Sequence, residues 1–325
     1  MRMKSLIAMA AMAAMAWSAA CGAQSYPSRP ITFVVPGPPG GATDTVARAL
    51  AEDLGKRLGQ TIIVDNKPGG AGVIAVQAIT RAAPDGYTIL LSHSSPLINT
   101  PHLYRNVPYD VRRDLAFITE VSVGKIVLVV NRDVPAKNVQ QFLDWAAKNK
   151  GKVSYGSYGV GTFPHLVGAH LNQVRGLDMA HVAYKGEAPM AQDMIAGNIA
   201  WAIGSMSTLG PHIKSGRLTA LAVMGDKRIK ELPDVPTMAE AGLKQQELRS
   251  PAWLGLFARS GTPAAVLSRL ETEARASIQS PTMRARLDAL AMDPVGNSAA
   301  EFRREFDATE PIIAQMIKAS GATAE

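Results

Sequence analysis

Two glycine-rich segments, each lying between an apolar run and a helix-forming run, constrain this sequence more than any other feature. The first extends from Gly37 to Asp44, and the second extends from Gly156 to His165. A helix leaves its first amide N–H groups without intrahelical partners, and glycine adds no side chain that would cover them. Two such segments, about 120 residues apart in the chain, therefore predict two lobes whose loops close on one small anion.

Short apolar strands alternate with amphipathic helices along most of the remaining chain, which predicts an α/β fold with mainly parallel sheets. Two long apolar strands, 125–131 and 253–258, mark the places where we expect the chain to cross between lobes. The last helix, expected over 298–317, should kink or break at Pro311 because proline lacks an amide donor. We therefore assign residues 24–130 and 253–325 to lobe 1 and residues 131–252 to lobe 2.

The first residues of the chain are typical of an export signal. Arg2 and Lys4 precede an apolar run that is too short to span a bilayer. Cleavage after Ala23 would release a mature chain of about 300 residues, which is enough for two lobes, so we expect a periplasmic protein. Cys21 is the only cysteine, which excludes an intramolecular disulfide and leaves open a lipid anchor at that residue.

Charge and residue clustering exclude several classes of function. The formal net charge is +7, but the basic residues are spread thinly and do not alternate with aromatic ones, so we expect no nucleic-acid partner. Six histidines include no pair at i,i+4 spacing and no H-E-x-x-H motif. We also find no paired carboxylates, reactive thiol or base–nucleophile pattern. We therefore predict a monomer without metal, cofactor or enzymatic activity.

The second glycine-rich segment differs from the known phosphate-binding and catalytic loops that it superficially resembles. A dinucleotide fingerprint would need glycine where the chain has Pro164. Ser157 is one glycine out of place for a nucleophile elbow. What remains is a loop that offers bare N–H groups together with the hydroxyls of Ser157 and Thr162. A structural turn and a catalytic serine are the alternatives to a binding loop.

These observations predict ligand-binding residues in both loops, at the end of the strand 87–91, and on the pocket wall. The alternative for the serine cluster after that strand is a set of turn hydroxyls, and the alternative for His165 is a loop cap. The candidates are Gly37, Pro39, Gly40, Gly41, Ala42, Thr43 and Asp44 in the first loop, Ser92, His93 and Ser94 after the strand, Ser157, Gly159, Gly161, Thr162 and His165 in the second loop, and Tyr184, Ala188 and Gly204 on the wall.

A series of ordered motifs extends over nearly the whole mature length. They are Pro39-Gly40-Gly41 with Asp44, Asn66-Lys67-Pro68-Gly69, Ala83-Pro84-Asp85-Gly86-Tyr87-Thr88, Gly159-Val160-Gly161-Thr162 with His165, His181-Val182-Ala183-Tyr184-Lys185-Gly186, and Leu232-Pro233-Asp234-Val235-Pro236-Thr237. With these motifs the chain resembles the Bug-type, TctC-like extracytoplasmic solute receptors of tripartite tricarboxylate transporters.

The resemblance implies a type II periplasmic binding protein fold, with two lobes, two crossing strands and a ligand cleft between them. It also implies that main-chain amides, hydroxyls and ordered water of the two loops grip a carboxylate without an obligatory arginine. The partner would be the membrane permease of such a transporter. Two alternatives stay open: a sensor that contacts a histidine-kinase ectodomain, and a periplasmic hydrolase that uses Ser157 or Ser94.

This chain departs from the family pattern where an acidic residue is often found. The strand after Gly197-Asn198 carries Ala200 and Gly204, and Ala183 stands where the family often has proline. An amino-acid ligand would need an acidic partner for its ammonium group. We therefore expect a plain carboxylate, namely a dicarboxylate, a tricarboxylate or an aromatic acid, rather than aspartate or glutamate.

Overall fold

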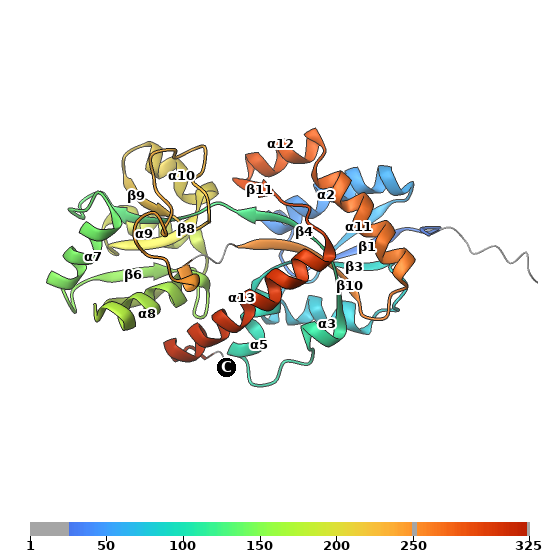
Figure 1. The fold of residues 1–325 in the computed structure, drawn as a ribbon, viewed down its shortest axis with the longest axis horizontal. Coiled ribbons are helices and arrows are strands. Elements are labelled where there is room, and N and C mark those ends of the chain that lie inside the picture. Colours follow the sequence, from blue (N-terminus) through green and yellow to red (C-terminus); the bar gives the residue numbers. More distant parts are fainter. Residues whose placement is uncertain (1–25, 249–251, 324–325) are drawn as a thin grey trace, which may run out of the picture.

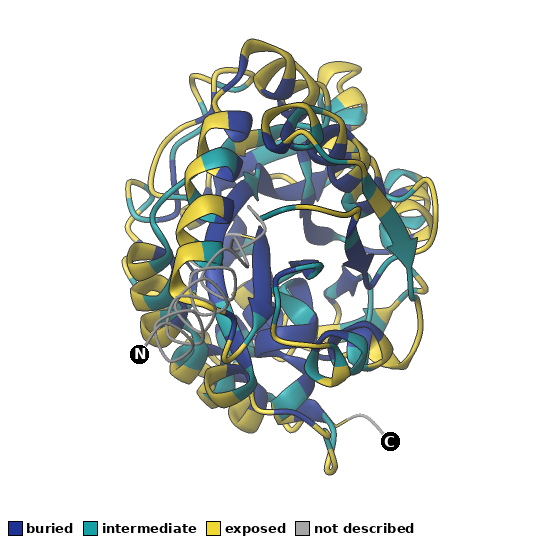
Figure 2. Cartoon of the chain, turned by 90° about the vertical axis from the view of Figure 1, so that its right-hand side faces the viewer, coloured by how far each residue is buried: buried dark blue, intermediate teal, exposed yellow. Residues whose placement is uncertain are grey.

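Two separate β-sheets, each covered by helices, divide the chain into two lobes (Figure 1). The computed structural model describes residues 26–248 and 252–323. The expected export signal and Cys21 lie outside these residues. The strands occupy the buried centre of each lobe, while the helices expose one side to solvent (Figure 2). In the described residues, no helix is both long enough and apolar enough to cross a membrane.

Lobe 1 is built on a six-stranded sheet with the order β11-β4-β10-β3-β1-β2. Its helices α2, α11 and α12 cover one face, and α3 and α13 lie on the other. The strands are β1 (Ile31–Val35), β2 (Ile62–Asn66), β3 (Thr88–His93), β4 (Leu115–Gly124), β10 (Trp253–Arg259) and β11 (Met292–Pro294). The helices are α2 (Ala42–Leu58), α3 (Val73–Arg81), α4 (Ser95–Ile98), α5 (Thr100–Leu103), α6 (Val111–Asp114), α11 (Ala264–Ile278), α12 (Pro281–Ala289) and α13 (Ala299–Ser320), with short 3-10 turns at Gly70–Gly72 and Gln246–Leu248.

Lobe 2 is built on a five-stranded sheet with the order β7-β6-β8-β5-β9. Trp201 and Tyr155 stack with ring centroids 5.1 Å apart in its core, and Phe142 packs edge-on against Trp201. The strands are β5 (Ile126–Asn131), β6 (Ser154–Ser157), β7 (Ala180–Ala183), β8 (Trp201–Ser205) and β9 (Leu218–Val223). The helices are α7 (Val139–Lys148), α8 (Phe163–Arg175), α9 (Glu187–Ala196) and α10 (Met206–Lys214).

The expected two-lobed α/β fold is confirmed, but the sheets are mixed rather than mainly parallel. Strands β1, β2 and β3 pair in parallel, as do β6, β7 and β8. The strands next to the crossings, β10 and β5, run antiparallel to all of their neighbours. A strand that enters a lobe from the other lobe must run opposite to one that leaves it, so the crossings impose this mixture.

The first crossing lies closer to the N-terminus than we predicted. Strand β5 pairs with β8 and β9 and therefore belongs wholly to the second sheet. The chain thus passes between lobes at Gly124–Lys125, and the predicted boundary at residue 130 is wrong. The apolar run gave no sign of this, because most residues of both β4 and β5 are buried and the two strands are almost continuous in the sequence. Strand β10 begins in the first sheet at Trp253.

Helix α13 spans the space between the lobes (Figure 1). Its first half buries Phe302 and Phe306 against Phe117 of lobe 1, with ring centroids 5.2 Å apart in each pair, and the helix also contacts α8 of lobe 2. The expected break at Pro311 is wrong, since one helix runs from Ala299 to Ser320. Buried residues lie on both sides of the proline, and their packing holds the two halves in one helix.

Candidate ligand-binding site

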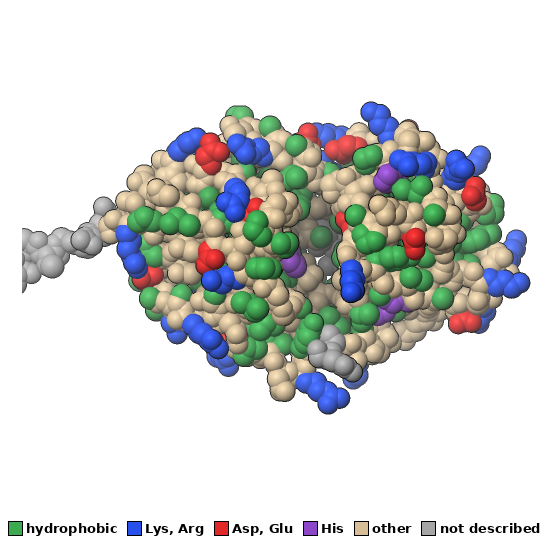
Figure 3. All heavy atoms as spheres, turned by 180° about the vertical axis from the view of Figure 1, so that it is seen from behind, with side chains coloured by type: hydrophobic (Ala, Val, Ile, Leu, Met, Phe, Trp, Pro, Cys, Tyr) green, Lys and Arg blue, Asp and Glu red, His purple; other side chains and the backbone are tan. Residues whose placement is uncertain are grey.

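The topology turns the predicted residues of both lobes toward each other. Strand β4 leaves lobe 1 at the edge where the parallel strands β1 and β3 also end. Strand β5 enters lobe 2 at Ile126, which pairs with Ser205 at the end of β8. The carboxyl ends of β1 and β3 therefore face those of β6, β7 and β8, where ligands bind in sheets of this kind. The surface is hollowed between the two lobes (Figure 3).

Hydrogen bonds to nearby polar side chains fix the conformation of the first glycine loop. Gly40 N–H donates to Asp44 Oδ2 at 2.8 Å, and Asn66 Nδ2 donates to the Gly37 carbonyl at 3.0 Å. Arg48 Nε also reaches Asp44 Oδ2 at 3.0 Å. Together these contacts fix the path of the chain from β1 into α2, so that the first amides of α2 are presented at the edge of lobe 1.

Asp44 is buried, at 2% exposure, and its carboxylate serves the loop. The hydrogen bond from Arg48 holds the pKa of Asp44 below its usual value, despite an opposing effect of burial. The side chain therefore stays ionised and would repel a carboxylate placed directly against it. Its other oxygen, Oδ1, has no hydrogen-bond partner among the described residues. Through Oδ2, Asp44 thus joins the predicted binding loop to Arg48 of α2.

The second glycine loop forms a tight internal network. The hydroxyls of Ser157 and Thr162 both donate to the Gly159 carbonyl, at 2.9 Å and 2.6 Å. Gly161 N–H donates to His165 Nδ1 at 3.0 Å. The alternative that His165 caps the loop therefore describes its contact in the structure, and the Gly161 amide is occupied. Among the described residues, no hydrogen bond joins this loop to the first one.

His165 stacks on His181, with ring centroids 4.0 Å apart. Burial lowers the pKa of His165, and burial together with His165 lowers the pKa of His181 to about 4. Both rings are therefore neutral near pH 7. A neutral His165 can accept the Gly161 N–H bond through Nδ1, so the loop geometry depends on the absence of a proton there.

Ser157 and His181 lie at the distance of a nucleophile and its base, with Oγ and Nε2 2.7 Å apart. Ser157 is nevertheless completely buried, and the lowered pKa of His181 makes it a weak base. In the described residues, no carboxylate hydrogen-bonds to His181. The pair resembles a catalytic arrangement in distance alone, so the observed geometry argues against the hydrolase alternative.

At the end of β3, the three predicted residues Ser92, His93 and Ser94 have different environments. Ser92 is buried and its hydroxyl donates to the His93 carbonyl at 2.9 Å, which matches the alternative of a turn hydroxyl. Burial lowers the pKa of His93 to about 4, so this imidazole is also neutral. Ser94 N–H donates to the Trp253 carbonyl at 3.2 Å, which places Ser94 beside the return crossing.

The pocket wall of lobe 2 contains an acidic residue that our sequence reasoning missed. Gly204 lies in β8, and a Cβ added there would come closer than 3.0 Å to Glu187 Oε1. The Glu187 carboxylate fills this space and accepts from Ser205 Oγ at 2.8 Å, from Thr208 Oγ1 at 3.1 Å and from Ser205 N–H. Burial raises its pKa. In the sequence, Glu187 follows directly after Lys185 and Gly186, and this pair gives no signal for such a contact.

The two remaining wall candidates differ in exposure. The Tyr184 hydroxyl donates to Asp193 Oδ2 at 2.8 Å and is committed to lobe 2. Ala188 is exposed in the first turn of α9.

Several helices begin at this edge with their first amides uncapped. Within the described chain, α2, α8 and α9 have no side chain that caps their first turn, whereas α7, α12 and α13 begin with capping Asn138, Ser280 and Ser298. Helix α11 is also uncapped and begins elsewhere, so a missing cap alone does not mark the site. What distinguishes α2, α8 and α9 is that they start from the facing strand ends, where their positive ends suit an anion.

A cavity of about 890 Å³ also lies between the lobes, beside Lys125 and Trp253. None of the predicted residues is among its described lining residues. Charges of both signs line this cavity, with Lys125, Lys227 and Arg228 beside Glu120, Asp226, Asp293 and Glu305, so its charge alone does not mark it as the ligand site. In residues 26–248 and 252–323, no three acidic, histidine or cysteine side chains gather in a way that could hold a metal ion.

Known proteins share both the sequence and the fold of this chain. The family model described as tripartite tricarboxylate transporter family receptor matches residues 46–321. BugT of Bordetella pertussis is 36% identical over 265 residues, covering 81% of this chain and 80% of BugT. An R. palustris protein solved with adipate is 28% identical with a TM-score of 0.77, covering 92% of this chain and 99% of that one. MatC of Rhodopseudomonas palustris, solved with bound malate, is 26% identical with a TM-score of 0.70, covering 89% and 100%.

Proposed function

This chain belongs to the tripartite tricarboxylate transporter receptor (TctC) family, and from that membership we propose that it binds a small carboxylate and passes it to a membrane permease. Its fold is the two-lobed fold of periplasmic binding proteins. The protein acts without catalysing a reaction, as a monomer in the periplasm. The observation that carries the proposal is the placement of the uncapped starts of α2 and α8 on facing edges of the two lobes.

Main-chain amides are sufficient for the required affinity. A hydrogen bond to a charged group contributes roughly 1.5–3 kcal/mol, and a micromolar complex needs about 8 kcal/mol. Several amides from two loops, together with the positive ends of their helices, supply a gross stabilisation of this size, from which the cost of ordering is subtracted. An arginine in the cleft is not needed.

The preferred ligand class is a plain carboxylate, and dicarboxylates come first. The two solved relatives described above hold adipate and malate, and both of these ligands are dicarboxylates. Glu187 is an acid next to Gly204, but hydrogen bonds to Ser205 and Thr208 engage both of its oxygens. Three donors therefore already bond to Glu187, and the ammonium group of an amino acid would have to compete with them. For this reason we rank aspartate and glutamate below the plain acids.

A thermal-shift screen tests this proposal. The protein would be purified, stripped of bound ligand by unfolding and refolding, and heated with malate, adipate, citrate, benzoate, glutamate or glucose. A ligand at a hundred times its dissociation constant adds about 2.7 kcal/mol of stability, so a true ligand gives a clear upward shift. A shift with glutamate or glucose, and none with any plain acid, would overturn the assignment.

The transport partner and the export route need tests in the cell. Loss of uptake after deletion of the gene supports a permease as partner, whereas loss of an induced response without loss of uptake supports the sensor alternative. The mass of the mature N-terminus distinguishes cleavage after Ala23 from a lipid anchor at Cys21.

A further inference from the structure

One buried side chain connects lobe 1 directly to the second glycine loop. Asn99 lies between α4 and α5 and is 8% exposed. Its Nδ2 donates to the Gly161 carbonyl of lobe 2 at 2.7 Å, across 62 residues of sequence. We propose that Asn99 is a latch that favours the closed arrangement of the lobes and so positions the second loop for its ligand. The inference rests on the proposed function of that loop.

Asn99 bonds to a residue, Gly161, whose backbone N–H already has a hydrogen-bond partner within lobe 2. Gly161 N–H donates to His165 Nδ1 within lobe 2, while the Gly161 carbonyl accepts from Asn99 of lobe 1. The peptide chain at Gly161 is thus held from both lobes at once. A movement of lobe 1 away from lobe 2 would release one side of this residue and leave the other in place.

Close packing accompanies the hydrogen bond. A Cβ at position 161 would come closer than 3.0 Å to Leu103 of α5, and Gly161 has a φ of +73°. Only glycine accepts both this backbone conformation and this approach without strain. The two lobes therefore meet at a position shaped for contact, which distinguishes the latch from two surfaces that touch incidentally.

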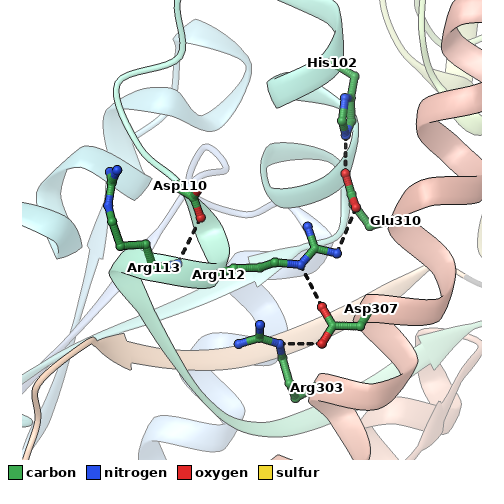
Figure 4. Close-up of polar contacts among 7 residues, drawn as sticks. All are labelled: His102, Asp110, Arg112, Arg113, Arg303, Asp307 and Glu310. Carbon is green, nitrogen blue, oxygen red and sulfur yellow. Dashed lines mark hydrogen bonds and ion pairs between the residues drawn. The ribbon is translucent and has the colours of Figure 1, made fainter.

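Hydrogen bonds within lobe 1 fix the position of Asn99 and of its neighbour Thr100. Asn99 N–H donates to the Ser95 carbonyl at 2.9 Å, and the Thr100 hydroxyl donates to the Ala71 carbonyl at 3.0 Å. His102 contacts Glu310 of α13, which also pairs with Arg112 (Figure 4). Because α4 follows directly after Ser94, the latch and this end of the predicted ligand site move together.

The expected effect on binding is modest and calculable. When the lobes separate, both the Asn99 amide and the Gly161 carbonyl regain water, so the net contribution is that of one ordinary hydrogen bond. Such a bond changes an equilibrium by about two- to tenfold. If the ligand binds only the closed arrangement, the apparent affinity falls with the closed fraction. The ligand itself need not touch Asn99.

The experiment compares Asn99→Ala and Asn99→Asp with a matched control, Asn131→Ala. Asn131 is 4% exposed, and its Nδ2 donates to the Met194 carbonyl at the same 2.7 Å, but both groups lie in lobe 2. Lobe separation is measured by spin-label distances between Ile74→Cys and Val174→Cys, two exposed positions on opposite lobes, in a Cys21→Ser background. Affinity for malate and adipate is measured by calorimetry.

We expect Asn99→Ala to lengthen the mean label distance and to weaken binding two- to tenfold. Asn99→Asp should lengthen it further, because a carboxylate cannot donate to the Gly161 carbonyl and repels it. Asn131→Ala should lower the melting temperature and leave distance and affinity unchanged. The alanine variant serves if the aspartate variant does not fold.

Two results separate this inference from the proposed function. If both Asn99 variants keep the wild-type distances and an affinity within twofold, the latch is refuted. If the wild-type protein binds no plain carboxylate, the proposed function fails, yet the label distances without ligand still decide whether Asn99 holds the lobes together.

Discussion

Substitution of Gly204 by alanine tests whether the missing side chain makes room for Glu187. A Cβ at this position would come closer than 3.0 Å to Glu187 Oε1 and within 2.7 Å of Leu209 Cδ1. Real Cβ atoms do not approach other atoms so closely, so the carboxylate has to leave its place. Leu209 is completely buried and can only shift slightly.

The displaced carboxylate loses its bonds from Ser205 N–H, Ser205 Oγ and Thr208 Oγ1. Each bond to a charged group contributes roughly 1.5–3 kcal/mol, but the carboxylate recovers water when it leaves, so we expect a total loss of about 2–4 kcal/mol. For a chain of about 300 residues, such a loss lowers the melting temperature by roughly 3–6 °C. A freed negative charge near the second loop should also weaken the binding of an anionic ligand.

The assay is a double-mutant cycle of Gly204→Ala and Glu187→Ala, followed by urea unfolding. If the two residues interact as described, alanine at 204 costs less when Glu187 is absent, and the coupling energy is about 1–2 kcal/mol. The contact with Leu209 is the same in both backgrounds and cancels in the cycle. The reasoning is refuted if Gly204→Ala costs less than about 0.5 kcal/mol, or if the two costs simply add.

Three further predictions follow from the loops and the crossing. Gly161→Ala should weaken carboxylate binding at least tenfold in calorimetry, because the added Cβ clashes with Leu103. Gly40→Ala should weaken it less, because the added Cβ has open space and only the backbone, at φ +80°, is strained. Equal effects of the two variants would contradict this prediction. Because the pKa of His181 is lower in the folded state, the unfolded state binds a proton at higher pH, and the free energy of unfolding should fall as pH drops from about 6.5 to 4. A His181→Gln variant whose stability falls with pH as steeply as that of the wild type would contradict this prediction. Lys125→Met removes the cation beside Glu231 and Asp293 and should reduce the salt dependence of unfolding, which an unchanged dependence would disprove.

Local patterns in the sequence predicted many of the helices and strands and the two loops, but they did not reveal β4, β7, β11 or α12. Helix α2 buries Val46, Leu50 and Leu54 at helical spacing, and the glycines that precede it predict the turn. The exact crossing was not predictable in this way, because Gly124–Lys125 is only a brief interruption between two buried strands. Periodicity indicates the type of an element and does not tell which sheet it joins.

The contacts that matter most in the candidate site were hidden because they depend on tertiary distance. Asn99 meets Gly161 across 62 residues, and Glu187 meets Ser205 across 18. Neither residue lies in a motif. Asn99 bonds to a backbone carbonyl, and Glu187 bonds to a backbone N–H and to the hydroxyls of Ser205 and Thr208. His165 was different, since its position four residues after Gly161 allowed the cap to be considered in advance.

Lobe 1 is assembled from both ends of the chain, and this has a consequence for synthesis. Its central strand β10 and the helix α13 come after all of lobe 2. In a nascent chain, β3 can therefore pair with β1 alone, and β4 has no partner strand until β10 has been made. The aromatic cluster around Phe117 is likewise incomplete until Phe306 has been made. A product that ends before residue 253 lacks the strand that joins β3 to β4 in this sheet. The order of elements delays the folding of lobe 1 until translation is nearly complete.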